Sequence, residues 1–375
     1  MKLFICGDIV NSKTCTNIVD EKLKNEIKSS DYALCNLEAP ISHKMSKPQK
    51  KIGASITQCK EAIKLLSETG FNVYSMANNH IFDFGERGLE STIDEIERFD
   101  GKSVGAGFTR NSIYSELILE KDNLTVGILS GGENEFGCAS DSDDTTGYAW
   151  ILSPEIEDKL RVLKKTVDKT IIISHAGLED VDLPLTFWRD KYRRFIDLGA
   201  DMVVGHHPHV PQGFETYSGK PIFYSLGNFF FDYNRSNSKS EDSFSLIINV
   251  VNNELIYDIV YHKLIDDVTT LVKREDVSFD IKHLNSLLDE NHKLRSDETC
   301  LKKYNEIYEG YYRKAMNIPK KNSGIVKLTK YIVKNIFLKS RVKKETDLML
   351  LHNIKIDTHL YLVKRALRLR VFDDK

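Results

Sequence analysis

Short apolar, β-rich runs alternate with helix-like segments from Leu3 to about His262, and this rhythm restricts the fold more than any other feature. Runs such as Leu3–Cys6, Tyr32–Cys35 and Asn72–Met76 have the length and apolar content of strands. Between them lie segments with helical periodicity, such as Gly85–Phe99. The order predicts stacked βα units, and hence an α/β fold with a mixed sheet whose outer faces carry helices.

The pattern changes towards the C-terminus. Ser243–Val251 and Leu255–His262 resemble an antiparallel pair of strands joined by a polar turn. After about Lys263 the segments become longer, charged and 3.6-periodic, as in Cys300–Met316 and Ile325–Leu338. We therefore expect an α/β domain over residues 1–262 and a basic helical extension over residues 263–375.

Neither export nor membrane insertion is expected from the composition. The chain enters a strand-like run directly at Met1, without the parts of a secretory signal, and no run reaches the roughly 18 apolar residues of a spanning helix. The six cysteines are scattered and form no Cys-x-x-Cys pair, which favours buried free thiols over a zinc knuckle or a disulfide framework. We expect a cytoplasmic protein.

The C-terminal extension is basic although the whole chain has a net charge of -2. Residues Lys320–Lys375 hold 15 Lys and Arg against 5 Asp and Glu. A solvated helical face is the first interpretation, and no nucleic acid is expected as a partner. The second interpretation is peripheral contact with the inner face of the membrane, or with a partner complex there. It uses an apolar row formed by Ile325, Leu328, Tyr331, Ile332 and Ile336.

Polar side chains able to bind metal recur directly after the predicted strands. In an α/β sheet such positions lie at the carboxyl ends of the strands, where ligands bind. Their carboxylates, carboxamides and imidazoles suit Mn, Fe or Zn. The clusters are Gly7-Asp8, Asn36-Leu37-Glu38, Asn78-Asn79-His80 with Asp83, Ser174-His175, and Gly205-His206-His207-Pro208-His209.

Each cluster also has an ordinary structural interpretation. A lone histidine such as His175 is more often a hydrogen-bonded residue than a metal ligand. Asn78 and Asn79 could instead form an Asx turn that caps the helix at Gly85–Phe99, and both roles can hold together. Three imidazoles within His206–His209 have little packing value, which favours metal binding there.

The order of these clusters is similar to that of calcineurin-like metallophosphoesterases. The residues within and around the clusters resemble those of the CapA branch, which is named for capsule synthesis. The resemblance runs from about Met1 to Asp232 and implies a metallophosphoesterase-like mixed β-sandwich flanked by helices. The segments that carry it are Asn36-Leu37-Glu38-Ala39-Pro40, Ala77–Gly85, Gly199-Ala200-Asp201 with Gly205–Val210, and Tyr224–Phe229.

The resemblance also implies roles for individual residues. Glu38 would bridge two divalent ions, with Asp8 and His209 completing one position. The other position would be completed by Asn79, His175 and His207. One or two ions per chain are expected, with Mn first and Fe or Zn as alternatives.

Beside the metal position, the resemblance implies that His80 protonates the leaving oxygen or stabilises the phosphoryl group, with Asp83 orienting it. Further contacts to a phosphorylated or polymeric anionic substrate are expected from Asn78, His206, Glu179 and Asn228.

One departure from the wider family stands in the first motif. The usual Asp-x-His is replaced by Asp8-Ile9-Val10, so one metal position lacks an imidazole.

Two functions follow as hypotheses. The first is a metal-dependent hydrolase of phosphoesterase type in capsule or surface-polymer synthesis, with a polymer such as poly-γ-glutamate. The alternative is a non-catalytic assembly or polymer-binding protein that retains the metal-site scaffold.

Overall fold

The chain divides into two compact units. A computed structural model describes all residues except 14–15, 42–46, 234–241, 317–338 and 373–375. The first unit comprises Met1–Gln49 and Ser55–His292, and the second comprises Lys50–Ala54 and Lys293–Lys375. The boundary predicted after His262 falls inside a strand of the first unit.

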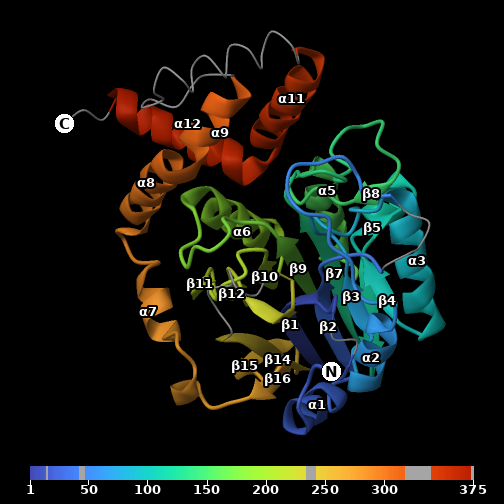
Figure 1. Ribbon diagram of the computed structural model, residues 1–375. Helices are drawn as coiled ribbons and strands as arrows, with labels where there is room; N and C mark the ends of the chain where they lie inside the picture. The colour runs from blue at the N-terminus through green and yellow to red at the C-terminus, as the bar shows by residue number, and fades with distance from the viewer. Residues whose placement is uncertain (14–15, 42–46, 234–241, 317–338, 373–375) are drawn as a thin grey trace. The chain divides into compact units, whose positions relative to one another are not determined.

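The first unit contains two large β-sheets (Figure 1). The first sheet has the order β16-β15-β14-β1-β2-β3-β4, and β13 also pairs with β1. Its strands are β1 (Lys2–Val10), β2 (Tyr32–Leu37), β3 (Val73–Ser75), β4 (Lys102–Val104), β13 (Asn228–Phe231), β14 (Asp242–Val251), β15 (Glu254–Ile265) and β16 (Val268–Leu271).

The second sheet has the order β11-β12-β10-β9-β7-β6, and β5 pairs with β8 in a small separate sheet. Its strands are β6 (Leu117–Lys121), β7 (Leu124–Gly132), β9 (Lys169–His175), β10 (Met202–His206), β11 (Phe214–Tyr217) and β12 (Lys220–Phe223). The small sheet consists of β5 (Ala106–Gly107) and β8 (Gly147–Tyr148).

The alternation of side chains along β1 shows how the layers are built. Leu3 and Ile5 belong to one apolar cluster together with Ile171 and Val204 of the second sheet. Phe4 points the other way, into a cluster with helix residues. Because successive strand side chains face opposite sides, β1 contributes to both the inter-sheet core and the helix-covered face.

Helices cover the outer faces of both sheets. Three of them, α1 (Glu21–Lys28), α2 (Ala62–Thr69) and α3 (Gly85–Arg98), contribute buried apolar residues to the cluster outside the first sheet. The short α4 (Arg110–Ile113) lies beside β5, whereas α5 (Pro154–Leu163) and α6 (Thr186–Leu198) pack against the second sheet. The predicted α/β sandwich flanked by helices is confirmed.

The end of the first unit includes α7 (Ile281–Ser286), and the second unit is helical. The helices are α8 (His292–Lys303), a π-helical turn (Tyr304–Tyr308), α9 (Glu309–Ala315), α11 (Lys339–Lys355) and α12 (Asp357–Phe372). This confirms the predicted helical extension. The predicted helix Ile325–Leu338, with the apolar row from Ile325 to Ile336, lies outside the described residues. Within the described ranges, none of the helices combines the length and apolarity needed to cross a membrane.

One of the described cysteines differs from the expectation that all cysteines are free thiols. Cys6, Cys35, Cys138 and Cys300 are buried free thiols, as expected. Cys59 is disulfide-bonded, so the expectation is wrong for this residue. Spacing in the sequence identifies local Cys-x-x-Cys pairs, but it carries no signal for a pair that folding brings together.

Candidate metal centre

The polar residues that follow the strands meet at one edge of the α/β unit. β1 and β2 are parallel, with Asp8 opposite Asn36, and β9 and β10 are parallel, with His175 opposite His206. Parallel strands bring their carboxyl ends to the same edge of a sheet. The first sheet therefore supplies the carboxylates of Asp8 and Glu38, and the second sheet supplies the imidazoles of His175 and His207.

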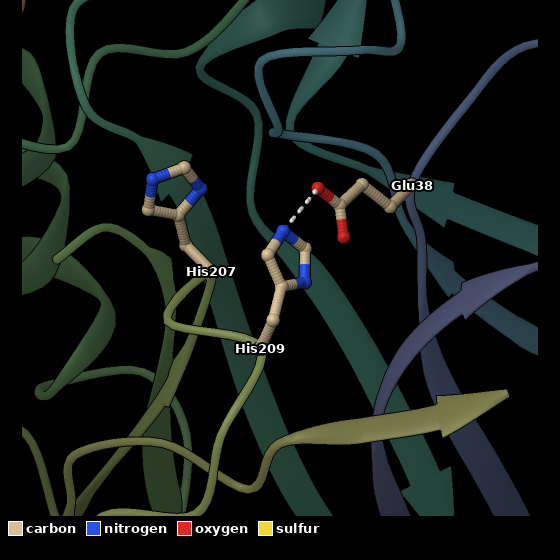
Figure 2. Close-up of side chains that lie close together, drawn as sticks. All are labelled: Glu38, His207 and His209. Atoms are coloured by element: carbon tan, nitrogen blue, oxygen red, sulfur yellow. Dashed lines mark ion pairs between the residues drawn. The ribbon is translucent and has the colours of Figure 1, made fainter. Parts of the chain in front are cut away.

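Glu38 lies at the centre of this cluster and is fully buried. Its Oε1 lies 3.5 Å from Nε2 of His175. The same oxygen lies 3.7 Å from Nε2 of His209 (Figure 2). Across the part of the chain that the structure describes, neither carboxylate oxygen of Glu38 has a hydrogen-bond partner. Burying a carboxylate without hydrogen bonds is costly, so this position is suited to a cation.

Glu38 is common to two groups of possible metal ligands. One group is Asp8, Glu38 and His175, and the other is Glu38, His207 and His209. In each group, one ligand atom from every residue lies within 4.8 Å of the others. A carboxylate shared by two groups has the placement that a bridging ligand requires.

Asp8 is held in place by hydrogen bonds and by a close backbone contact. Its Oδ1 accepts from Nδ2 of Asn36 at 2.7 Å, and its Oδ2 accepts from the backbone N–H of His207 at 3.2 Å. A Cβ on the preceding Gly7 would lie 1.8 Å from the carbonyl oxygen of Gly227, so only glycine allows this approach.

The imidazoles are packed against one another and against amide oxygens. Nε2 of His175 lies 3.0 Å from Oδ1 of Asn79 and 3.0 Å from Nδ1 of His207. Nδ1 of His209 lies 2.9 Å from Oδ1 of Asn228. His207 and His209 have φ values of 93° and 59°, a backbone region that is uncommon for residues other than glycine.

The charges of the cluster favour a cation. Burial opposes protonation of His175, but the carboxylates of Glu38 and Asp8 outweigh burial and raise its pKa to about 10. Burial likewise opposes the charge on Asp8, yet His175 holds the pKa of Asp8 well below its usual range. Burial, followed by the charge on His175, lowers the pKa of His207 well below 6.5. The cluster thus stabilises positive charge, and its donor set fits a divalent metal ion.

His80 and Asp83 form a pair next to the cluster. Nδ1 of His80 lies 2.7 Å from Oδ2 of Asp83, which also accepts from the backbone N–H of Ile56 at 2.8 Å. The His80 side chain keeps 14% of its surface exposed, whereas Asp83 keeps 1%. His80 is thus more accessible than its partner, and Asp83 is fixed beneath it.

The other predicted substrate-binding residues lie in different surroundings. Oδ1 of Asn78 accepts from the backbone N–H groups of His80 and Ile81, so Asn78 forms an Asx turn. The expectation that this turn caps α3 is wrong, because that helix begins after Phe84 without a side-chain cap. His206 is fully buried with its Nε2 3.0 Å from the carbonyl oxygen of Cys6, and Glu179 is exposed. Asn228 contacts His209. Their roles in substrate binding stay predictions.

One buried carboxylate of the site was not identified from the sequence. Glu133 directly follows β7, is 1% exposed, and places Oε1 3.5 Å from Nε2 of His207. It forms a third group of possible ligands with Glu135 and His207. The same rule that identified Asp8 and His175, a polar side chain directly after a parallel strand, applies to Glu133 and could have found it.

Comparisons with known proteins agree with the resemblance found in the sequence. The family model for the bacterial capsule synthesis protein PGA_cap matches residues 2–233. The PGA biosynthesis protein CapA of Bacillus subtilis is 32% identical over 236 residues, which cover 60% of this chain and 62% of the relative. The capsule biosynthesis protein CapA of Bacillus anthracis is 30% identical over 245 residues, covering 62% and 58% respectively.

Among the solved structures that match this chain is that of a putative 5'-nucleotidase from Staphylococcus aureus in complex with alpha-ketoglutarate. It has a TM-score of 0.47 and 13% sequence identity, and the match covers 77% of this chain and 58% of that chain. The present chain aligns with less than two thirds of the length of each Bacillus relative. Because the family model matches more than half of the chain, this protein belongs to the family of bacterial capsule synthesis proteins PGA_cap.

Proposed function

We propose that this protein is a metal-dependent hydrolase that acts on a phosphate ester or a similar bond during synthesis of a capsule or a related surface polymer. The names of the Bacillus relatives support the pathway, and poly-γ-glutamate is the polymer proposed on that ground. The observation that carries the proposed chemistry is Glu38, a buried carboxylate without hydrogen-bond partners among the described residues and flanked by imidazoles.

The two ligand sets that the resemblance implies share Glu38, and they exchange His175 and His209 relative to the two groups of neighbouring ligand atoms described above. Asp8, Glu38 and His209 would hold one divalent ion, and Glu38 with Asn79, His175 and His207 would hold another. Mn is the proposed metal, with Fe and Zn as alternatives. Such an ion supplies Lewis acidity towards a phosphoryl oxygen.

The remaining chemistry falls to the chain's own residues. The Asp83 carboxylate fixes the His80 ring through Nδ1, which leaves Nε2 as the ring atom that donates a proton to the leaving oxygen. Proton transfer by a positioned side chain contributes about 10²–10⁴-fold to a rate. The His80 side chain keeps 14% of its surface exposed and that of His209 keeps 21%, so a phosphorylated or polymeric anionic substrate can approach this side of the cluster.

A second candidate function is a non-catalytic assembly or polymer-binding protein. Val10 stands where the wider family has the histidine of Asp-x-His, and its side chain is fully buried in β1. The position formed by Asp8, Glu38 and His209 therefore has one imidazole instead of two. A scaffold with one weakened metal position suits a protein that binds polymer without turning it over.

The cytoplasm, with contact at the inner face of the membrane, is the proposed location. The buried free thiols at Cys6, Cys35, Cys138 and Cys300 support a reducing compartment, whereas the bonded Cys59 counts against it. Cell fractionation combined with a thiol-labelling assay would show whether the protein is in a reducing or an oxidising compartment.

The test of the proposed function is metal content per chain by elemental mass spectrometry, combined with turnover of phosphate esters. Wild type purified without chelator should carry close to one Mn, Fe or Zn, and His207→Ala should lose it. His283→Ala, which removes an exposed histidine from α7, is the matched control and should keep the metal.

Turnover separates the two functions. His80→Ala should retain the metal and lose turnover by about 10²–10⁴-fold. A wild type that purifies metal-free and also rejects added Mn and Zn would refute the hydrolase proposal. Metal-loaded protein that binds poly-γ-glutamate yet hydrolyses no phosphate ester would favour the non-catalytic function.

A further inference from the structure

We propose that Glu133 is a positioning residue of the metal centre, whose carboxylate holds the His207 ring through Nε2 and thereby presents Nδ1 to the metal. This inference rests on the proposed function, since it assigns a role towards the same metal. Glu133 lies outside the sequence segments on which the family resemblance was based.

The two ring nitrogens of His207 face different groups. Nδ1 lies 3.0 Å from Nε2 of His175, within the ligand cluster, and Nε2 lies 3.5 Å from Oε1 of Glu133. Figure 2 shows one ring nitrogen of His207 on the side of Glu38 and the other turned away. A metal-binding imidazole uses one nitrogen for the ion and commonly donates the other N–H to a carboxylate, which fixes the ring and its tautomer.

Glu133 is itself rigidly held. Its backbone N–H donates to the carbonyl oxygen of His175 at 3.0 Å, and its carbonyl oxygen accepts from the Tyr148 hydroxyl at 3.0 Å. Its Oε1 also accepts from the backbone N–H of Gly177 at 3.1 Å. At the preceding Gly132, a Cβ would lie 2.9 Å from the carbonyl oxygen of Ala77, so β7 can approach this closely only with glycine. The carboxylate therefore has a defined position relative to both His175 and His207.

Burial makes the electrostatic effect of this carboxylate large. Glu133 is 1% exposed and His207 is 4% exposed, so water screens their interaction little. A negative charge on the far side of a ligand imidazole increases the basicity of the nitrogen that binds the ion. Glu133 should therefore strengthen binding at the position that includes His207.

A competing arrangement uses the same residues. Glu133, Glu135 and His207 could hold an ion by themselves, because their ligand atoms lie within 4.8 Å of one another. That arrangement would make Glu135 as important as Glu133. In the positioning role, Glu135, which is only half-buried, contributes little.

The experiment is a calorimetric titration of chelator-stripped full-length protein with Mn²⁺, for wild type, Glu133→Gln and Glu135→Gln. Glu133→Gln should weaken Mn²⁺ binding by about 10–100-fold without lowering the number of ions bound at saturation. Glu135→Gln should bind within about twofold of wild type. The visible spectrum of Co²⁺-loaded protein should change in Glu133→Gln, because the field of the His207 ligand changes.

The outcomes separate this inference from the function on which it rests. Equal Mn²⁺ affinity and an unchanged Co²⁺ spectrum in Glu133→Gln would overturn the role of Glu133 while the metal centre stands. A loss of one bound ion in both Glu133→Gln and Glu135→Gln would also overturn it, in favour of a separate ion site. A wild type without any Mn²⁺ binding would instead overturn the proposed function.

A conservative variant provides a check if Glu133→Gln does not fold. Glu133→Asp keeps the charge but withdraws the oxygen from His207 by one methylene. Glu133→Asp should bind Mn²⁺ more weakly than wild type. Where Glu133→Gln does fold, Glu133→Asp should bind Mn²⁺ more tightly than Glu133→Gln. Wild-type affinity in a folded Glu133→Asp would contradict the need for contact with His207.

Discussion

At the residue scale, the pair formed by His80 and Asp83 makes a direct prediction about catalysis. Asp83→Asn keeps the shape of the side chain but removes the charge that faces Nδ1 of His80 at 2.7 Å. We expect kcat for a phosphate ester to fall by at least about tenfold, and by less than the roughly 10²–10⁴-fold expected for His80→Ala. Steady-state kinetics with the metal content measured in parallel would check this.

The metal content is the control in that experiment. If Asp83→Asn lost both metal and activity, Asp83 would support the ligand cluster and not the proton donor. Unchanged kcat with full metal content would show that Asp83 does not orient His80.

His262 makes a prediction about stability and pH. It is 1% exposed, and burial lowers its pKa from 6.5 to about 3, so the folded protein keeps it neutral where the unfolded chain protonates it. Between these two pKa values the unfolded state binds more protons, so His262 makes stability fall as pH falls from 6.5 towards 3. At pH 5 the loss from His262 should be about 2 kcal/mol, at 1.36 kcal/mol per pKa unit.

The measurement is urea unfolding at pH 7 and pH 5 for wild type and His262→Gln. Both tryptophans, Trp150 and Trp188, belong to the α/β unit, so their fluorescence reports on the unit that holds His262. The variant should lose about 2 kcal/mol less than wild type between the two pH values. The same loss in both proteins would mean that His262 is not the titrating group.

At the residue scale, the sequence pattern singles out polar residues that stand at the end of a strand or directly after it. The structure brings Asp8, Glu38, His175 and His207 together because each stands at the carboxyl end of a parallel strand or just beyond it. Glu133 obeys the same rule but lies outside the sequence segments on which the resemblance was based. The roles of the individual side chains stay predictions until variants are measured.

At the scale of the elements, Gly205 tests how tightly the strands are packed behind the site. A Cβ on Gly205 would lie 2.0 Å from the carbonyl oxygen of Tyr224, and backbone atoms cannot yield as a flexible side chain would. Gly205→Ala should therefore destabilise the α/β unit by more than about 3 kcal/mol, or prevent its folding. Urea unfolding followed by tryptophan fluorescence would measure the loss.

Gly310 provides the matched control for the same substitution. It lies in α9, and an added Cβ would meet nothing within 4 Å. Gly310→Ala should stabilise the helical unit by about 0.5–1 kcal/mol, because alanine is the better helix former. The midpoint of urea unfolding of the helical unit, followed by circular dichroism, would show this increase in stability. A Gly205→Ala protein as stable as wild type would contradict the close contact between β10 and Tyr224.

Elements with a strong periodic signal were predicted well, and short or irregular ones were not. The helix predicted at Gly85–Phe99 is α3 (Gly85–Arg98), and the predicted antiparallel pair corresponds to β14 and β15. The four-residue β13 was not predicted, since a strand this short is specified by its pairing with β1 and not by its own residues. Helix α5 had a recognisable start in Ser153, whose side chain accepts from the Glu155 N–H.

At the scale of the whole molecule, metal binding should be visible as stability. A ligand that binds only the folded state at about 100 times its Kd stabilises that state by about 2.7 kcal/mol. Adding Mn²⁺ to chelator-stripped protein should raise the urea midpoint reported by tryptophan fluorescence, and EDTA should reverse the rise. His207→Ala should show no rise, whereas His283→Ala should behave as wild type.

The basic extension makes a prediction about membranes, which stays a proposal. Helix α12 exposes Leu360, Leu367, Val371 and Phe372 together with basic residues. Full-length protein should float with vesicles containing anionic lipid, and less so at high salt, because salt screens surface charges. Lys364→Glu with Arg368→Glu should reduce flotation. Flotation that does not depend on anionic lipid would refute the membrane contact.

The extent of the α/β unit shows where sequence reasoning fails at this scale. The change in periodicity near Lys263 suggested a boundary, but the compact unit continues to His292. Ile281 and Leu284 of α7 belong to the cluster between the two sheets, so the chain after His262 still completes the core. A change from strand to helix in the sequence marks a change of element, and only packing shows where a unit ends.

The ligand cluster draws on both sheets, and this has a consequence for the order of events during folding. Asp8 lies in β1 and Glu38 follows β2, whereas His175 ends β9 and His207 follows β10, so neither sheet alone presents these four donors around Glu38. A folding intermediate in which only one sheet has formed would lack half of the donors. The nascent protein should therefore capture its ion late, after the two sheets have docked, and the ion should slow unfolding far more than it accelerates folding.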